Sequence, residues 1–85
     1  MNTFLLNISS PDGNLFADQV TKITLRGVEG DLAVLAGHMP FITSVIPCDV
    51  HVTLPDDTVK TGRTQGGLLT VSHNTVTLLG SFHWL

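Results

Sequence analysis

The sequence predicts one small all-β domain, and three observations carry that prediction. Its 85 residues suffice for a single domain with one thin core. β-branched residues are abundant (11 Thr, 9 Val and 4 Ile), whereas strong helix formers are scarce (3 Ala, 1 Glu and 2 Lys). Eight Gly and four Pro supply turns between short apolar segments. We therefore expect a β-sandwich or small barrel, with no helix longer than about two turns.

The first segments predict strands on both sides of a turn. Residues 3–9 alternate, with Phe4, Leu6 and Ile8 on one face, as in a strand with one face toward a core. Residues 11–14, Pro-Asp-Gly-Asn, form a strong turn signal, after which Leu15 and Phe16 begin a short segment.

The next strand is expected over residues 20–26, with Ile23 and Leu25 on its apolar face. Because Val20 is out of phase with Ile23, the pattern predicts a bulge or bend near Thr21. The following residues, 27–30, have the composition of a loop.

The middle of the chain predicts three more strands. Residues 31–36 are apolar on both faces, which favours a strand covered on both sides. Residues 37–40 interrupt the pattern before the apolar segment 41–46. In residues 49–54 apolar and polar side chains alternate, which predicts a half-buried strand.

The C-terminal part predicts a weak edge strand and a clear hairpin. Residues 58–64 are polar and β-branched, as expected of the edge strand. Residues 68–72 and 75–79 flank the two-residue turn His73-Asn74, where Asn tolerates the left-handed backbone. Phe82 and Trp84 alternate with His83, so the tail is expected to finish a strand or pack on a neighbour.

Composition restricts the possible partners. The net charge is −3 with only four Lys and Arg, which argues against nucleic acid as a partner. Charged residues make up only 13% of the chain, about half the usual share, which suggests a surface covered by a protein partner. We find no signal peptide or transmembrane segment in the sequence. The single cysteine excludes an intrachain disulfide and fits a reducing compartment.

No pattern in the chain predicts catalytic or metal chemistry. Cys48 and His51 have C-x-x-H spacing, but they fall on opposite faces of an extended strand, so we expect no metal site. No Gly-x-Ser-x-Gly motif and no phosphate-binding loop is present, and we expect neither a catalytic residue nor a bound cofactor. His38 lies in a loop with Met39 and Phe41, residue types enriched at interfaces, so this loop is a candidate docking loop; the alternative is that His38 is merely solvated.

The order and spacing of several motifs resemble the epsilon subunit of bacterial F-type ATP synthases (delta in mitochondria), specifically its N-terminal β-sandwich domain. The resemblance covers roughly residues 3–79. It rests on these segments: Ser10-Pro11-Asp12-Gly13-x-Leu15-Phe16, Gly27-x-Glu29-Gly30-Asp31-Leu32-x-Val34-Leu35, Gly37-His38-x-Pro40-x-Ile42-Thr43, Gly66-Gly67-Leu68-Leu69-x-Val71 and Asn74-x-Val76-Thr77-Leu78-Leu79. The chain departs from the family pattern at four positions: Ala33, Ala36, Cys48 and Thr70.

The resemblance implies a fold and a function. The fold is a sandwich of two sheets with about five short strands each, formed by residues 1–85 as one domain. The function is that of a non-catalytic central-stalk subunit, which docks the gamma subunit onto the c-ring and couples translocation of protons or sodium ions to ATP synthesis. It would lie at the cytoplasmic face of the bacterial inner membrane, reaching the membrane only through the complex. The site residues carried over for the c-ring and gamma contact are Glu29, Asp31, His38, Met39 and Phe41.

Typical family members continue into a two-helix hairpin that inhibits ATP hydrolysis. No segment here matches that hairpin, so we expect no inhibition of that kind.

Three alternative interpretations remain. Glu29 can instead be a solvated acid of the turn. A free-standing ligand-binding sandwich is disfavoured because the chain has no Tyr and one Trp, and a small enzyme has no residue constellation to support it.

Overall fold

The computed structural model describes residues 2–85, and within them the chain is all-β, as predicted. No helix in this range could span a membrane. The ten strands are β1 (Phe4–Ser10), β2 (Gly13–Val20), β3 (Lys22–Gly27), β4 (Gly30–Leu35), β5 (Phe41–Val45), β6 (Cys48–Thr53), β7 (Val59–Thr64), β8 (Gly67–Ser72), β9 (Thr75–Gly80) and β10 (His83–Trp84).

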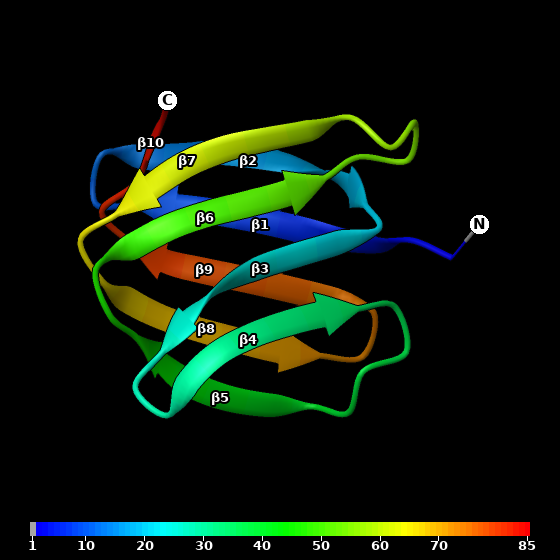
Figure 1. Cartoon of the computed structure of the whole chain (residues 1–85), viewed down its shortest axis with the longest axis horizontal. Coiled ribbons are helices and arrows are strands. Elements are labelled where there is room, and N and C mark those ends of the chain that lie inside the picture. The colour runs from blue at the N-terminus through cyan, green and yellow to red at the C-terminus, as the bar shows by residue number, and fades with distance from the viewer. Residues whose placement is uncertain (1) are drawn as a thin grey trace.

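The strands form two packed layers, which confirms the sandwich (Figure 1). The front layer has the order β10-β7-β6-β3-β4, and the back layer has the order β5-β8-β9-β1-β2. Nearly all neighbours are antiparallel, but β1 pairs with β9 in parallel. The layers are one curled sheet, because the end of β3 pairs with the end of β5 through Gly27 and Val45.

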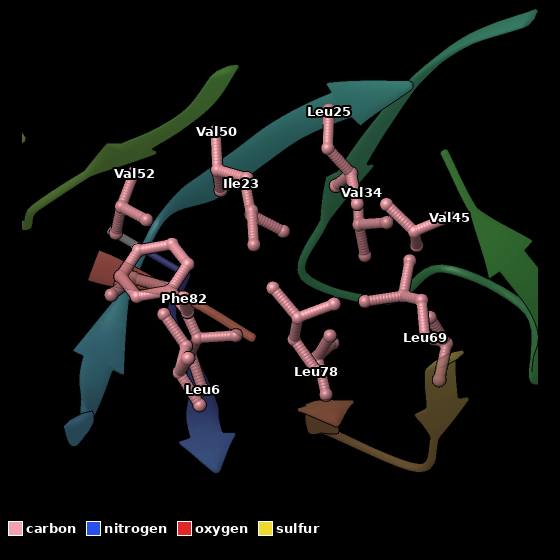
Figure 2. Packing of buried hydrophobic residues seen from close by; sticks show 14 of the residues in the cluster. Leu6, Ile23, Leu25, Val34, Val45, Val50, Val52, Leu69, Leu78 and Phe82 are labelled. Carbon is pink, nitrogen blue, oxygen red and sulfur yellow. The ribbon is translucent and has the colours of Figure 1, made fainter. Parts of the chain in front are cut away.

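The core lies between the layers and consists of one side-chain cluster (Figure 2). Figure 2 shows Ile23 and Val50 of the front layer facing Leu78 of the back layer. The buried apolar residues are Phe4, Leu6, Ile8, Val20, Ile23, Leu25, Val34, Val45, Cys48, Val50, Val52, Leu69, Val71, Val76, Leu78 and Phe82.

Alternation predicted the buried face correctly in several strands. In β1, β3 and β6 the residues that were expected to face the core are buried, and their neighbours in sequence are more exposed. The β8–β9 hairpin turns at His73-Asn74, and Asn74 has the left-handed φ of 60° that this turn type favours. The tail also behaves as expected, because β10 pairs with β7 and Phe82 is buried.

Two predictions near the N-terminus need correction. The segment that begins at Leu15 is not short: β2 has eight residues and pairs along the length of β1. The bend predicted near Thr21 is confirmed, and it divides the strand expected over residues 20–26: Val20 ends β2, and β3 begins at Lys22 after the chain crosses from the back to the front layer. The bend explains why Val20 and Ile23 are both buried although they are out of phase. The irregular register lies elsewhere, between Ile8 and Ser9.

The prediction that residues 31–36 are covered on both faces is wrong. Strand β4 buries Val34 and partly buries Leu32, while Ala33 and Leu35 are exposed, Leu35 by 52%. The reason is its place in the sheet: within residues 2–85 β4 is an edge strand that pairs only with β3, and no layer covers its outer face. The predicted edge strand β7 is an edge along part of its length, because β10 covers it at Gly62 and Arg63.

A buried hydroxyl fixes the end of the sandwich where the chain crosses twice between the layers, after β7 and after β9. Thr64 is fully buried, and its Oγ1 donates to the carbonyl oxygen of Ser81 at 2.6 Å and accepts the backbone N–H of Gly66 at 3.1 Å. The two crossings approach closely because Gly67 has no side chain; a Cβ there would overlap the carbonyl of Leu79. Thr64 therefore ties the two layers together through their connections.

An aspartate holds the turn between β6 and β7. Leu54 N–H donates to the Thr58 carbonyl at 2.8 Å, and Asp57 N–H donates to the Leu54 carbonyl at 2.9 Å. The Asp56 carboxylate accepts the Thr58 N–H at 3.0 Å, and this hydrogen bond lowers the pKa of Asp56 below its ordinary value.

We expect Thr64→Val to destabilise the domain by about 1–3 kcal/mol, because valine keeps the shape of this buried side chain but leaves the Gly66 N–H and the Ser81 carbonyl without their shared partner. Chemical denaturation measures the free energy of unfolding. The control is Thr77→Val on β9, whose hydroxyl forms no hydrogen bond within residues 2–85 and whose loss should change stability by about 0.5 kcal/mol at most. Equal effects of both substitutions would show that Thr64 has no special role.

We expect the Asp56 turn to make stability depend on pH. Because the folded state lowers the pKa of Asp56, its contribution is present above about pH 4, the ordinary aspartate pKa, and is lost as the pH falls through the folded pKa. Asp56→Asn cannot titrate, so the difference in unfolding free energy between the parent and this variant should be constant near neutral pH and change below about pH 4. A difference that stays constant from neutral to acidic pH contradicts this account.

Candidate partner-binding surface

The hairpin between β3 and β4 carries the first two predicted site residues. Its two-residue turn consists of Val28 and Glu29, flanked by Gly27 and by Gly30, which has a φ of 123° that few other residues adopt. The N–H of Val28 donates to the Ser44 carbonyl on β5 at 3.1 Å. This bond fixes the turn against the back layer, with Glu29 exposed.

Asp31 begins β4 and forms an ion pair across the hairpin. Arg26 Nε donates to Asp31 Oδ1 at 2.8 Å, and this hydrogen bond together with the negative charge of Asp31 raises the pKa of Arg26. Both side chains are exposed, so the pair adds little to stability. Within residues 2–85 Glu29 forms no ion pair, so its charge is available to a partner.

The loop between β4 and β5 carries the other predicted residues. Its backbone turns where the His38 N–H donates to the Leu35 carbonyl at 3.2 Å. The His38 ring lies 5.1 Å from the Phe41 ring, and its Nδ1 lies 3.2 Å from the Met39 carbonyl oxygen. Met39 is 79% exposed, which leaves a large apolar side chain in solvent.

The hairpin turn and the loop border one surface hollow of about 460 Å³. The hollow brings together Glu29, Asp31, His38 and Phe41, four of the five predicted residues, whereas Met39 lies outside it. Leu32 and Ile42 add apolar lining from β4 and β5. The arrangement places two acids and a histidine around an apolar floor, which suits contact with a protein surface.

Sequence reasoning missed a second feature, the outer surface of the back layer. Cross-strand pairing aligns exposed or half-exposed side chains of β1, β5, β8 and β9, and none of them is charged. We call this surface the uncharged face; it consists of Leu5, Asn7, Ile42, Ser44, Leu68, Thr70, Ser72, Thr75, Thr77 and Leu79. Its apolar side chains include Ile42, which is 67% exposed. An outer sheet surface without any charge is typical of a surface that another protein covers.

One signal in the sequence could have revealed the uncharged face. From Thr64 to the end of the chain there is no Asp, Glu, Lys or Arg, although residues 68–79 form an amphipathic hairpin. A hairpin with one face in solvent normally carries charged side chains on that face. Their absence from both strands of the hairpin indicates the covered surface.

Cys48 and His51 lie on opposite faces of β6, as predicted: Cys48 is buried and His51 is exposed. The Cys48 thiol has a structural partner, because Sγ accepts the backbone N–H of Arg26 at 3.3 Å.

Comparison with known proteins identifies the class of this domain. Residues 3–81 match the family described as ATP synthase, Delta/Epsilon chain, beta-sandwich domain. The chain belongs to this family.

Two curated relatives are epsilon chains. The chain is 35% identical over 83 residues to the sodium-ion-specific ATP synthase epsilon chain of Acetobacterium woodii, an alignment that covers 96% of this chain and 62% of that protein. It is 29% identical over 79 residues to the ATP synthase epsilon chain of Wolbachia pipientis subsp. Culex pipiens, which covers 93% of this chain and 70% of that one. The chain thus spans about two thirds of the length of these relatives.

Two solved structures share the fold. A chain of the Euglena gracilis mitochondrial ATP synthase (OSCP/F1/c-ring) superposes with a TM-score of 0.91 at 24% identity, covering 96% of this chain and 53% of that one. A chain of the Tetrahymena thermophila mitochondrial ATP synthase (central stalk and c-ring) gives a TM-score of 0.78 at 13% identity, covering 93% and 64%. At these identities the likeness establishes the shared fold.

Proposed function

We propose that this domain is a non-catalytic rotor component of an F-type ATP synthase. In this role it docks the gamma subunit onto the c-ring at the cytoplasmic face of the bacterial inner membrane, and it couples ion translocation to ATP synthesis. The observation that carries the proposal is the family match over residues 3–81. The relatives are themselves epsilon chains of ATP synthases.

The surface supports a division of roles. The uncharged face extends over four strands, so it fits a stable contact with the gamma subunit, in which excluded water and apolar burial dominate. The hollow with Glu29, Asp31 and His38 is lined from β4, β5 and the turns at both ends of β4, and it carries charged side chains, so it fits a contact with the c-ring or the adjacent foot of gamma.

Introducing one carboxylate into the uncharged face should weaken binding of the gamma subunit. We expect Thr77→Glu to lower the affinity by about 100-fold or more, because an unpaired charge buried in an interface costs about 3–5 kcal/mol. Titration calorimetry with purified gamma measures the effect. The matched control is Val59→Glu on β7, whose 54% exposed side chain lies in the front layer. If gamma binds both variants with parent affinity, this face does not contact gamma.

Reversing the charge at the hollow should lower coupling in the complexes that assemble. We expect Glu29→Lys/Asp31→Lys to lower ATP synthesis per assembled complex several-fold, because two positive side chains then replace the acids that would face a polar surface of the partner. ATP synthesis driven by an ion gradient in reconstituted vesicles provides the measurement. Asp18→Lys/Asp49→Lys is the matched control: it makes the same change in net charge and also breaks one surface ion pair, that of Asp49 with Arg63. Normal coupling in the Glu29 and Asp31 variant would count against these residues.

A further inference from the structure

Within residues 2–85 no strand pairs with the outer edge of the six-residue strand β4, although the Leu35 carbonyl at its end accepts the His38 N–H. Within residues 2–85 β4 pairs only with β3, along an unbroken register from Lys22–Leu35 to Gly27–Gly30. In Figure 1 β4 forms the lower border of the front layer. Such an edge presents unpaired backbone donors and acceptors to another strand.

The hairpin geometry identifies the outward-facing backbone groups. Gly27 and Gly30 flank a two-residue turn, so they form a hydrogen-bonded pair, and such pairs alternate with non-bonded pairs along the hairpin. Arg26 opposite Asp31 is then a non-bonded pair. The structure agrees, because the Arg26 N–H and carbonyl bond away from β4, to Cys48 Sγ and to the Ile46 N–H. By the same alternation the outward N–H groups of β4 are those of Asp31, Ala33 and Leu35.

The other strand edges are better protected than that of β4, whose Leu35 carbonyl accepts the His38 N–H but whose remaining length carries no covering strand within residues 2–85. The edge strand β2 has an irregular register where it pairs with Ile8 and Ser9 of β1. Asp18 of β2 is paired with Leu6, so it places a charge on the inward face of this strand. β7 carries Lys60 and Arg63 and is partly covered by the two-residue β10. On β5 the Ser44 carbonyl is already bonded to Val28. β4 has no proline, no bulge and one charged residue, Asp31, which is paired with Arg26.

The surroundings of the edge define the chemistry of a strand that could add to it. The hollow beside β4 has Leu32, Phe41 and Ile42 in its lining, so an apolar side chain of an added strand fits there. On the opposite face the added strand would lie beside Ala33 and the exposed Leu35. The acid Glu29, which has no ion pair, lies at the turn end and favours a cationic residue at that end of the strand.

We propose that the edge of β4 binds an extended segment of the gamma subunit as an eleventh strand, with apolar side chains toward the hollow and a basic residue near Glu29. This inference rests on the proposed function for the identity of the partner. Its binding mode is β-augmentation, in which main-chain hydrogen bonds supply affinity and alternate side chains supply specificity.

Hydrogen exchange of single amides tests the binding mode directly. The isotopically labelled 85-residue chain is measured by NMR, free and in complex with unlabelled gamma subunit. We expect the outward amides of Asp31, Ala33 and Leu35 to exchange at least about tenfold more slowly in the complex. The inward amides of Leu32 and Val34, bonded to β3 in both states, serve as internal controls.

A pair of substitutions at Ala33 separates backbone from side-chain contributions. Ala33→Pro removes one outward N–H and leaves the β3 hydrogen bonds intact, since proline is tolerated on an edge strand. It should weaken gamma binding by about tenfold or more, because it also blocks approach of the added strand. Ala33→Val keeps the N–H and the edge, and its affinity should stay within about threefold of the parent.

The outcomes separate this inference from the proposed function. If gamma binds and the three outward amides remain unprotected, β-augmentation is wrong and the proposed function stands. If gamma does not bind the parent chain, the proposed function is wrong, and the inference about β4 fails with it. Protection that appears without gamma and increases with concentration of the chain would assign the edge to a second copy of this chain and overturn the inference.

Discussion

Strand β3 holds the two layers together, and the rest of the sandwich depends on how it does so. Along one edge it pairs fully with β4; along the other it pairs with β6 at Lys22–Thr24 and with β5 at Gly27. Where β6 diverges, the N–H of Arg26 faces no carbonyl, and an unpaired buried donor would destabilise the fold. The Cys48 thiol accepts that N–H, and the Arg26 carbonyl accepts the N–H of Ile46. This corner lets one strand belong to both layers.

The same corner positions the candidate site. The hairpin turn follows directly after Gly27, and its Val28 N–H is bonded to β5, so Glu29 and Asp31 are held against the strand that carries Phe41 and Ile42. The resulting hollow combines residues of β4 and β5 with Glu29 of the turn and His38 of the loop, and the strands of both layers support it. Cys48 is also a departure from the family pattern. Its φ is negative, so the backbone there does not require glycine, and the thiol takes a structural role at the corner.

The sequence was sufficient for elements whose signals are local. The alternation in β1 and β6 and the Asn74 turn each lie within a few residues, so the buried faces and the last hairpin were predicted correctly. The length of β2 was not predictable, because its exposed, polar residues are held by pairing with β1 rather than by their own pattern. The uncharged face was missed for a related reason. Its residues come from four strands, and only the parallel pairing of β1 with β9 aligns Asn7 with Thr77. The four residues gathered at the hollow were named in advance, but their common location follows from the corner at Gly27.

The wrong prediction that β4 is covered on both faces has a physical explanation. The sequence of this strand is apolar on both faces, a pattern that normally accompanies burial on both sides. The folded chain buries Val34 and partly buries Leu32, leaving Leu35 more than half exposed beside an edge to which no strand pairs within residues 2–85. An exposed apolar strand without protecting charges or proline is an aggregation hazard for a protein that remains alone. The pattern is consistent, however, if β4 is an interior strand of the assembly rather than of the isolated domain. Its sequence then reflects contacts made in the complex, and it marks the place where the fold of this chain continues into that of its partner.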